Sequence, residues 1–435
     1  MINATSKLIT SRFSKNVLAL VSGAFIAQVI SFAASPILTR LYTPENFGLF
    51  ALFLSYVNIV SKVGTLCYER AIILPKNNSS AYNIAFLSLI ILLVIALLST
   101  SLIFAFSGRL LSLLKGAYTI SWLYWVPAGL LLVGIFNIVK SLHIRQKGFR
   151  SIAFARIGEA ASASVAKIAI ALFAGATAGG LILGTITGFM VSLAIIIRSP
   201  DLFHFAEIRR SLNSKSIKAV AVEYIQFPLY ATCNAILTVI TQNLIVLVFS
   251  IIFSPVIVGL YSLGNRIIRR PLNIMSMSVQ NVFFQRIAHE YNHGARILPS
   301  LIKTTGVLFI TGCIPFLLLM IYAEPLFGTI FGKKWFQAGV YVRILSPWFL
   351  VLFAVAPANT TYEVFKKQHM KVFFTLAKAL LSISAIWLGY KLTGKPEDVI
   401  AYFVSANVLV EISIIVGAIF ITYKNDLTTI SGKAA

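Results

Sequence analysis

Apolar stretches of about 20 residues recur along the whole chain and are separated by short polar connections. A helix needs about 20 apolar residues to cross the hydrocarbon core of a bilayer, so each stretch predicts a membrane-spanning helix. The pattern predicts an all-α membrane protein of about twelve transmembrane helices, with no connection long enough for a separate folded domain. The predicted spans are residues 17–38, 47–70, 81–105, 119–142, 157–175, 179–198, 221–250, 256–284, 300–323, 337–361, 370–390 and 399–423.

Composition supports this class, because 58% of the 435 residues are hydrophobic and only 11% are charged. A soluble chain of this length could not bury so much apolar surface. The first apolar run follows basic residues, but further runs follow it, which favours an uncleaved first span over a signal peptide. Cys67, Cys233 and Cys313 lie far apart in apolar stretches, so we expect small core side chains rather than a disulfide or a metal site.

The net charge of +24 comes from 37 Lys and Arg against 13 Asp and Glu. Nucleic acid is not the expected partner, because no soluble domain carries this charge. Two membrane explanations remain, namely cytoplasmic loops that face anionic lipid and a cationic cavity for an anionic substrate. Most Lys and Arg in the loops fall on the side of the N-terminus, which predicts that both termini are cytoplasmic.

An internal repeat relates the two halves of the chain. Residues 41–52 (LYTPENFGLFAL) align with residues 252–263 (IFSPVIVGLYSL). In each copy a Thr or Ser is predicted to cap a helix whose first residue is proline. The matched positions are Pro44 with Pro255, Gly48 with Gly259 and Leu49 with Leu260.

The repeat predicts two six-helix lobes, residues 1–210 and 211–435, around a central cavity. Six spans in each half place both halves the same way up, with a pseudo-twofold axis along the membrane normal. A second, weaker echo aligns the basic turn Arg145-Gln146-Lys147 with Lys366-Lys367-Gln368.

Polar residues recur at helical spacing within four of the predicted spans. In the repeat, each polar position of the second span is equivalent to a polar position of the eighth span. The first and seventh spans carry polar stripes of their own. These four spans are expected to line the cavity, whereas the third, sixth, ninth and eleventh are expected to face lipid. The stripes are Ser55, Asn58, Lys62, Thr65 and Glu69 in the second span; Arg266, Arg269, Asn273, Ser276 and Gln280, with Arg270 beside them, in the eighth; Gln28, Ser31 and Ser35 in the first; and Gln226, Tyr230, Asn234, Thr238 and Thr241 in the seventh.

A cavity with this lining favours an anionic, sugar-bearing ligand. Arginine binds phosphate oxygens in a bidentate manner, and amide and hydroxyl side chains suit sugar hydroxyls. We expect Arg266, Arg269, Arg270 and Lys62 to bind a diphosphate, and Asn58, Asn273, Gln280, Gln28, Tyr230 and Asn234 to line the sugar region. The alternative is that these residues cross-link helices and anchor them to lipid headgroups. No catalytic residue, metal site or cofactor is expected.

Other charges within the spans are predicted to be structural. Glu159 and Lys167 are candidates for an ion pair, and Arg343 and Glu411 are expected in ion pairs as well. A buried acid can also carry a coupling proton, and the candidates for that role are Glu69, which is on the polar stripe, Glu159, Glu223 and Glu411. Six prolines within five of the spans, Pro228 among them, predict kinks that could act as hinges.

Residues 36–53 (PILTRLYTPENFGLFALF) resemble the signature near the start of Wzx-type polysaccharide flippases. Residues 68–75 (YERAIILP) and the basic turn around Gln146 and Arg150 are also similar to that family. The resemblance implies the fold of the multidrug/oligosaccharidyl-lipid/polysaccharide exporter superfamily. It also implies an undecaprenyl-diphosphate-linked repeat unit as cargo, moved by alternating access to the periplasmic leaflet of the bacterial inner membrane. Coupling to a proton or sodium gradient is reported for parts of the superfamily, and a polysaccharide polymerase and a chain-length regulator are candidate partners.

The main competing hypothesis is a drug or cation antiporter of the same superfamily. Such a protein would favour acids in its cavity, so the basic stripe argues against it. A second alternative is a sugar transporter of another twelve-helix class. Such transporters carry a Gly-Asp-Arg-Gly-Arg type of motif in a cytoplasmic loop, and that motif is absent after the second span of this sequence. A membrane-bound polymerase or glycosyltransferase is not expected, because neither a large external loop nor a cluster of acids is present in the sequence.

Overall fold

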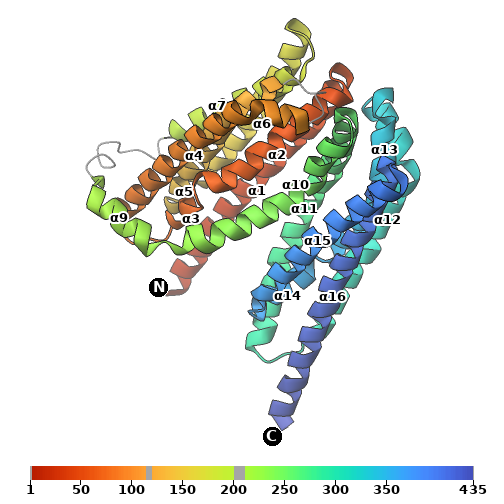
Figure 1. Ribbon diagram of the computed structural model, residues 1–435. Helices are drawn as coiled ribbons and strands as arrows, with labels where there is room; N and C mark the ends of the chain where they lie inside the picture. The colour runs from red at the N-terminus through yellow and green to blue at the C-terminus, as the bar shows by residue number, and fades with distance from the viewer. Residues whose placement is uncertain (1, 114–119, 200–210, 435) are drawn as a thin grey trace. The chain divides into compact units, whose positions relative to one another are not determined.

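A computed structural model describes residues 2–113, 120–199 and 211–434 of the chain. The described residues form helices joined by short connections, with no strand among them (Figure 1). The predicted all-α class is therefore confirmed.

The chain divides into two compact units, Met1–Gly259 and Leu260–Ala435. The predicted lobe boundary after residue 210 adjoins residues 200–210, which lie outside the described residues, and it stays a prediction. The first unit contains α1 (Ile2–Leu41), α2 (Pro44–Gly64), α3 (Tyr68–Ala71), α4 (Asn78–Leu113), the 3₁₀-helix η1 (Ile120–Trp125), α5 (Val126–Arg145), α6 (Phe149–Phe173), α7 (Ala178–Ile197), α9 (Ser214–Glu223), the π-helix η2 (Phe227–Ala231) and α10 (Thr232–Ile252). Helix α11 (Pro255–Asn292) begins in the first unit and continues into the second, which adds α12 (Leu298–Ile330), η3 (Lys333–Trp335), α13 (Phe336–Ala354), α14 (Ala356–Val364), α15 (Gln368–Thr393) and α16 (Pro396–Ala434).

Ten segments of the described chain are long and apolar enough to cross a membrane. Two further long helices, α6 and α11, occupy the places of the predicted fifth and eighth spans. They fall outside the ten because charged side chains, such as Lys167 in α6 and Arg266 in α11, interrupt their apolar runs. The structure therefore has a long helix at each of the predicted spans.

The same helix pairings recur in the two units, which supports the internal repeat. The third span packs against the fourth in each unit, as α4 against α5 and as α12 against α13. The fifth packs against the sixth, as α6 against α7 and as α15 against α16. The fourth also contacts the sixth, as α5 against α7 and as α13 against α16.

The two copies of the proline motif meet at the starts of α2 and α11, within the first unit. Thr43 caps α2 as predicted, because its hydroxyl oxygen accepts a hydrogen bond from the Asn46 N–H at 3.3 Å. A Cβ atom at Gly48 would overlap the carbonyl oxygen of Pro255, and a Cβ atom at Gly259 would overlap that of Pro44. The contact is reciprocal, so glycine at both positions permits the close approach of the two helix starts.

The basic turns also repeat, but their register differs from the predicted one by two residues. Lys147 and Lys366 both adopt left-handed backbone conformations, with φ of 63° and 55°. The N–H of the next residue reaches back to the preceding helix in each turn, from Gly148 to His143 O and from Lys367 to Tyr362 O, both at 2.8 Å. Lys366 is thus equivalent to Lys147, because both occupy the left-handed position of the same helix-ending motif.

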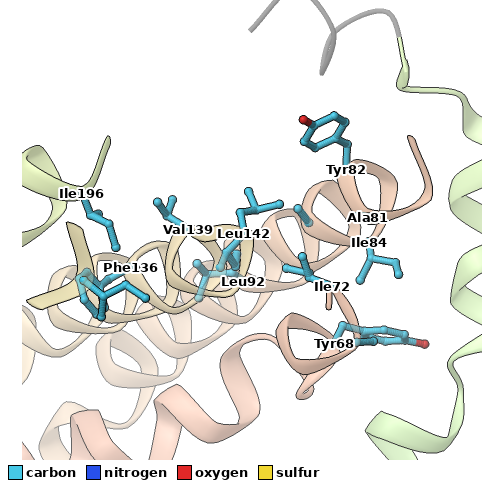
Figure 2. Packing of buried hydrophobic residues seen from close by; sticks show 14 of the residues in the cluster. Tyr68, Ile72, Ala81, Tyr82, Ile84, Leu92, Phe136, Val139, Leu142 and Ile196 are labelled. Carbon is cyan, nitrogen blue, oxygen red and sulfur yellow. The ribbon is translucent and has the colours of Figure 1, made fainter. Parts of the chain in front are cut away.

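A large apolar core of the first unit lies among α3, α4 and α5, with contributions from α6, α7 and α9. Figure 2 shows part of this cluster, with labelled side chains from α3, α4, α5 and α7. Leu92 of α4 packs directly against Gly134 of α5. A second cluster, in the second unit, gathers residues of α11, α12, α14 and α16 around Tyr362.

Most residues of the apolar windows of α4, α12 and α15, three of the four helices predicted to face lipid, are not buried. The fourth, α7, differs, because half of its apolar window is buried. Gly184 and Gly188 of α7 lie directly against Lys167 and Ala163 of α6. Small residues four apart allow two helices to approach closely, which explains the burial.

Candidate functional site

The polar stripe predicted for the second span is divided between two helices. Helix α2 ends at Gly64, and Leu66 and Cys67 follow with φ of 47° and 58°. Glu69 therefore belongs to α3, and the prediction of five polar residues on one continuous helix is wrong. Thr65 and Glu69 nevertheless meet, because the Thr65 hydroxyl donates a hydrogen bond to Glu69 Oε2 at 2.5 Å.

The three remaining positions of that stripe, Ser55, Asn58 and Lys62, lie on α2. The Ser55 side chain is buried, Lys62 is half-buried and Asn58 is exposed. Burial of Cys67, which follows this helix, raises the pKa of its thiol and keeps the side chain protonated.

A cluster of charged side chains, most of them basic, interacts with Lys140 in the first unit. The ammonium group of Lys140, on α5, interacts electrostatically with Arg156, Lys62, Glu69 and Arg70. Lys140 also donates a hydrogen bond to Asn137 Oδ1 at 3.3 Å. Lys140 and Arg156, which were not among the predicted site residues, both lie within helices. The spacing of Asn137 and Lys140 on one helix face was the available signal.

Arg145 holds the segment that follows α3. Its guanidinium group donates to the carbonyl oxygens of Ile72, Ile73, Pro75 and Lys76, and to Asn78 Oδ1. The shortest of these contacts, to Pro75 O, is 2.5 Å. The arginine thereby satisfies carbonyl groups that have no helical partner, which links the basic turn to residues 72–78.

The polar stripe predicted for the eighth span lies on one uninterrupted helix, α11. Arg266 and Arg269 are half-buried on it, and Arg270 is exposed. Arg266 and Arg270 are one turn apart and interact electrostatically. The remaining members of the stripe are Asn273, Ser276 and Gln280, of which Asn273 is exposed and the other two are half-buried.

Arg269 belongs to a network within the second unit. Its guanidinium carbon lies 5.4 Å from the ring centroid of Trp348, which is on α13. The ammonium group of Lys378, on α15, lies 5.3 Å from the same ring and 2.5 Å from Glu411 Oε1 on α16. Glu411 also interacts electrostatically with Arg269. The network brings two cations and one carboxylate to a single indole ring.

The polar side chains predicted for the first and seventh spans have unequal exposure. Gln28 is half-buried on α1, whereas Tyr230 and Asn234 are exposed, Tyr230 to 73%. Tyr230 lies on the π-helix η2, which contains Pro228. A proline lacks the N–H of a regular helical turn, which explains the local π geometry at the position of the predicted kink.

The other charged pairs differ in part from those predicted. Glu159 pairs with Arg156 at 3.0 Å rather than with Lys167. The Lys167 ammonium group instead lies 4.8 Å from the ring centroid of Phe50. A spacing of eight residues is about 12 Å along a helix, which is too long for the predicted contact. Arg343 pairs with Glu324, and Glu411 with Lys378, so both are in ion pairs as expected.

The structure thus places Lys62 and Glu69 where both interact electrostatically with Lys140 in the first unit, and it places Arg266, Arg269 and Arg270 on one helix. The joining of these groups with the polar side chains into one binding site stays a prediction.

Several solved structures share this fold. Lipid II flippase MurJ in an inward closed conformation aligns with a TM-score of 0.67 and 12% identity, over 94% of this chain and 90% of that one. An inward-facing multidrug resistance MATE family transporter of the MOP superfamily aligns with a TM-score of 0.63 and 12% identity, over 93% and 99%. A point mutant of the Vibrio cholerae MATE transporter VcmN aligns with a TM-score of 0.62 and 15% identity, over 98% of both chains. At these identities the likeness shows that the chain shares the fold of these structures.

No curated protein sequence matches the chain. A protein-family model described as "Polysaccharide biosynthesis protein" matches residues 37–339. The match covers well over half of the 435 residues and includes both copies of the proline motif. This multi-pass membrane protein therefore belongs to the polysaccharide biosynthesis protein family.

Proposed function

We propose that this protein is a flippase for lipid-linked oligosaccharides. Its cargo is an undecaprenyl-diphosphate-linked repeat unit of O-antigen or of another surface polysaccharide. The protein moves this unit from the cytoplasmic to the periplasmic leaflet of a bacterial inner membrane, with both of its own termini in the cytoplasm. Membership of the polysaccharide biosynthesis family and the fold that it shares with a lipid II flippase support the proposal.

The observation that carries the proposal is the arginine face of α11. Three arginines occur within five residues of this helix, and Glu411, the carboxylate that interacts with Arg269, is already paired with Lys378. A charge within a membrane span costs about 2.5–3.5 kcal/mol on insertion scales, so such residues mark substrate or ion pathways. Arginine keeps its charge when it is poorly hydrated and matches phosphate oxygens, which favours a diphosphate ligand.

Each part of the cargo has a proposed partner. Arg266, Arg269 and Arg270 bind the diphosphate, and Lys62 is a further candidate cation for it. The amides of Asn58, Asn273, Gln280, Gln28 and Asn234, together with Tyr230, contact sugar hydroxyls. The lipid tail stays in the bilayer while the headgroup crosses by alternating access. Glu69 is the proposed coupling acid for a proton or sodium gradient.

The test is complementation of a strain that lacks the gene. We expect the strain to lose surface polysaccharide and to accumulate undecaprenyl-linked repeat units on the cytoplasmic leaflet. The wild type should reverse both effects, whereas Arg269→Ala and Arg266→Ala should not, at equal protein levels in the membrane. Arg286→Ala is the matched control, because Arg286 is on the same helix but is 56% exposed and pairs with Glu290.

Two results would contradict the proposal. Normal surface polysaccharide without accumulation in the deletion strain would favour the drug or cation antiporter. Full activity of both Arg266→Ala and Arg269→Ala would remove the arginine face from the mechanism.

A further inference from the structure

Three connections of the first unit enclose a cavity of about 350 Å³, away from the polar stripes. The lining residues Glu45 and Asn46 come from the start of α2, and Trp122 and Trp125 come from η1. Thr177 comes from the connection just before α7. In the predicted topology all three connections face the periplasm. The volume is within the range of small-ligand sites, about 300–1,000 Å³.

The walls of the cavity are held in place by contacts outside it. The Asn46 side-chain amide donates to Ala176 O at 2.9 Å, which ties the start of α2 to the connection before α7. Trp122 is 3% exposed and packs against Tyr56, with ring centroids 5.7 Å apart. The Asn46 and Trp122 side chains in the cavity wall are therefore held in place.

A hydrogen-bond acceptor and a hydrogen-bond donor both remain available at this cavity. Asn46 keeps its Oδ1 as an acceptor, because Nδ2 is the atom bound to Ala176. The Thr177 oxygen accepts the Gly180 N–H at 3.4 Å, so its hydroxyl proton can be donated to a ligand. No lysine or arginine among the described residues forms an ion pair with Glu45, which is exposed. Trp125, 39% exposed, adds a flat apolar face.

We propose that this cavity binds a sugar ring of the exported glycan on the periplasmic side. The inference rests on the proposed function and identifies a second contact with the same cargo. A sugar ring has an apolar face that stacks on an indole, and hydroxyl groups that both donate and accept hydrogen bonds. Trp125 supplies the stacking face, Glu45 and Asn46 accept hydroxyl protons, and Thr177 donates one.

Other occupants fit less well. An organic cation would be attracted by Glu45 and by the indole rings, but the starts of α2 and α7 place the positive ends of two helix dipoles at the cavity. A phospholipid headgroup would bring a phosphate towards the Glu45 carboxylate. Trp122 is too deeply buried to act as an interfacial aromatic anchor, which would face lipid and water.

The test measures binding by the full-length protein in nanodiscs. The probe is the free oligosaccharide released by mild acid from the lipid-linked units that the deletion strain accumulates. We expect saturable binding that Trp125→Ala and Glu45→Gln each weaken by about tenfold, the loss expected for one stacking contact or one hydrogen bond to a charged group. Trp387→Phe is the matched control, because Trp387 is 61% exposed on α15 of the second unit.

The design separates this inference from the proposed function. Arg269→Ala should abolish export but leave the affinity for the free oligosaccharide unchanged, because that probe has no diphosphate. If Arg269→Ala abolishes export while Trp125→Ala and Glu45→Gln change neither export nor affinity, the sugar site is wrong and the flippase stands. Binding of tetraphenylphosphonium or of phosphatidylglycerol that depends on Glu45, without oligosaccharide binding, would also overturn the sugar site.

Discussion

The Lys378–Glu411 pair joins α15 to α16 inside the second unit, and its removal should show how a buried charge is stabilised. The two charged atoms are 2.5 Å apart, and the exposed fractions of the side chains are 19% for Lys378 and 4% for Glu411. Substitution of Glu411 by glutamine leaves the Lys378 ammonium group without its counter-charge. Loss of one partner of a buried pair costs about 3–5 kcal/mol, and a lone charge within a span costs about 2.5–3.5 kcal/mol.

The expected loss of stability is therefore about 3 kcal/mol. Each kcal/mol lowers the midpoint of thermal unfolding by about 2–4 °C for a unit of this size, so Glu411→Gln should lower it by roughly 10 °C. Lys378→Met should have a smaller effect in the same direction, because it leaves a carboxylate that Arg269 still partly compensates. The double substitution Lys378→Met/Glu411→Leu should restore most of the midpoint, because neither charge then remains buried.

The assay is differential scanning fluorimetry of the purified protein in detergent, with matched variants of a second pair. Lys371 and Glu363 are 2.7 Å apart but are 34% and 48% exposed. An exposed pair contributes about 0–1 kcal/mol, so Glu363→Gln should change the midpoint by a few degrees at most. Equal effects of Glu363→Gln and Glu411→Gln, or a double variant less stable than Glu411→Gln, would refute the argument from burial.

Two further predictions concern the first unit. Gly48→Ala should greatly reduce the yield of folded protein, because the added Cβ meets the backbone oxygen of Pro255 and overpacking against a rigid group costs about 1–3 kcal/mol or more. Size-exclusion chromatography measures the yield, and Gly108→Ala is the control because Gly108 has open space around it. A normal elution profile for Gly48→Ala would refute the contact. Arg145→Ala should make the connection after α3 sensitive to protease, because carbonyl groups of residues 72–76 lose their hydrogen-bond donor. Limited proteolysis measures the cleavage of this connection, with Lys147→Ala as the control. Equal cleavage of the two variants would refute the role of Arg145.

Local sequence patterns determine much of this protein. Apolar runs of sufficient length predicted the positions of the long helices, because the hydrophobic thickness of a bilayer sets the length of a span. The motif of Pro44 and Gly48 and its copy at Pro255 and Gly259 predicted the repeat. The helical spacing of Arg266 and Arg269 predicted that both lie on one face of a helix, and α11 is uninterrupted at these positions.

The break after α2 shows where local patterns fail. Leu66 and Cys67 adopt left-handed conformations although neither residue is glycine. Such conformations cost about 1–2 kcal/mol per residue, so packing around the buried Cys67 must stabilise them. The continuous stripe predicted through Glu69 therefore could not be corrected from the sequence.

Contacts between distant helices were also decided only by the tertiary structure. Lys378 and Glu411 are 33 residues apart, and Arg145 is about 70 residues from the carbonyl groups that it binds. The cavity of Glu45, Trp125 and Thr177 likewise joins three separate connections. Hydropathy and helical spacing determine which side chains share one helix face, because both are local properties of the chain. Which faces then meet depends on the packing of whole helices, and burial, ion pairing and cavities follow from that packing.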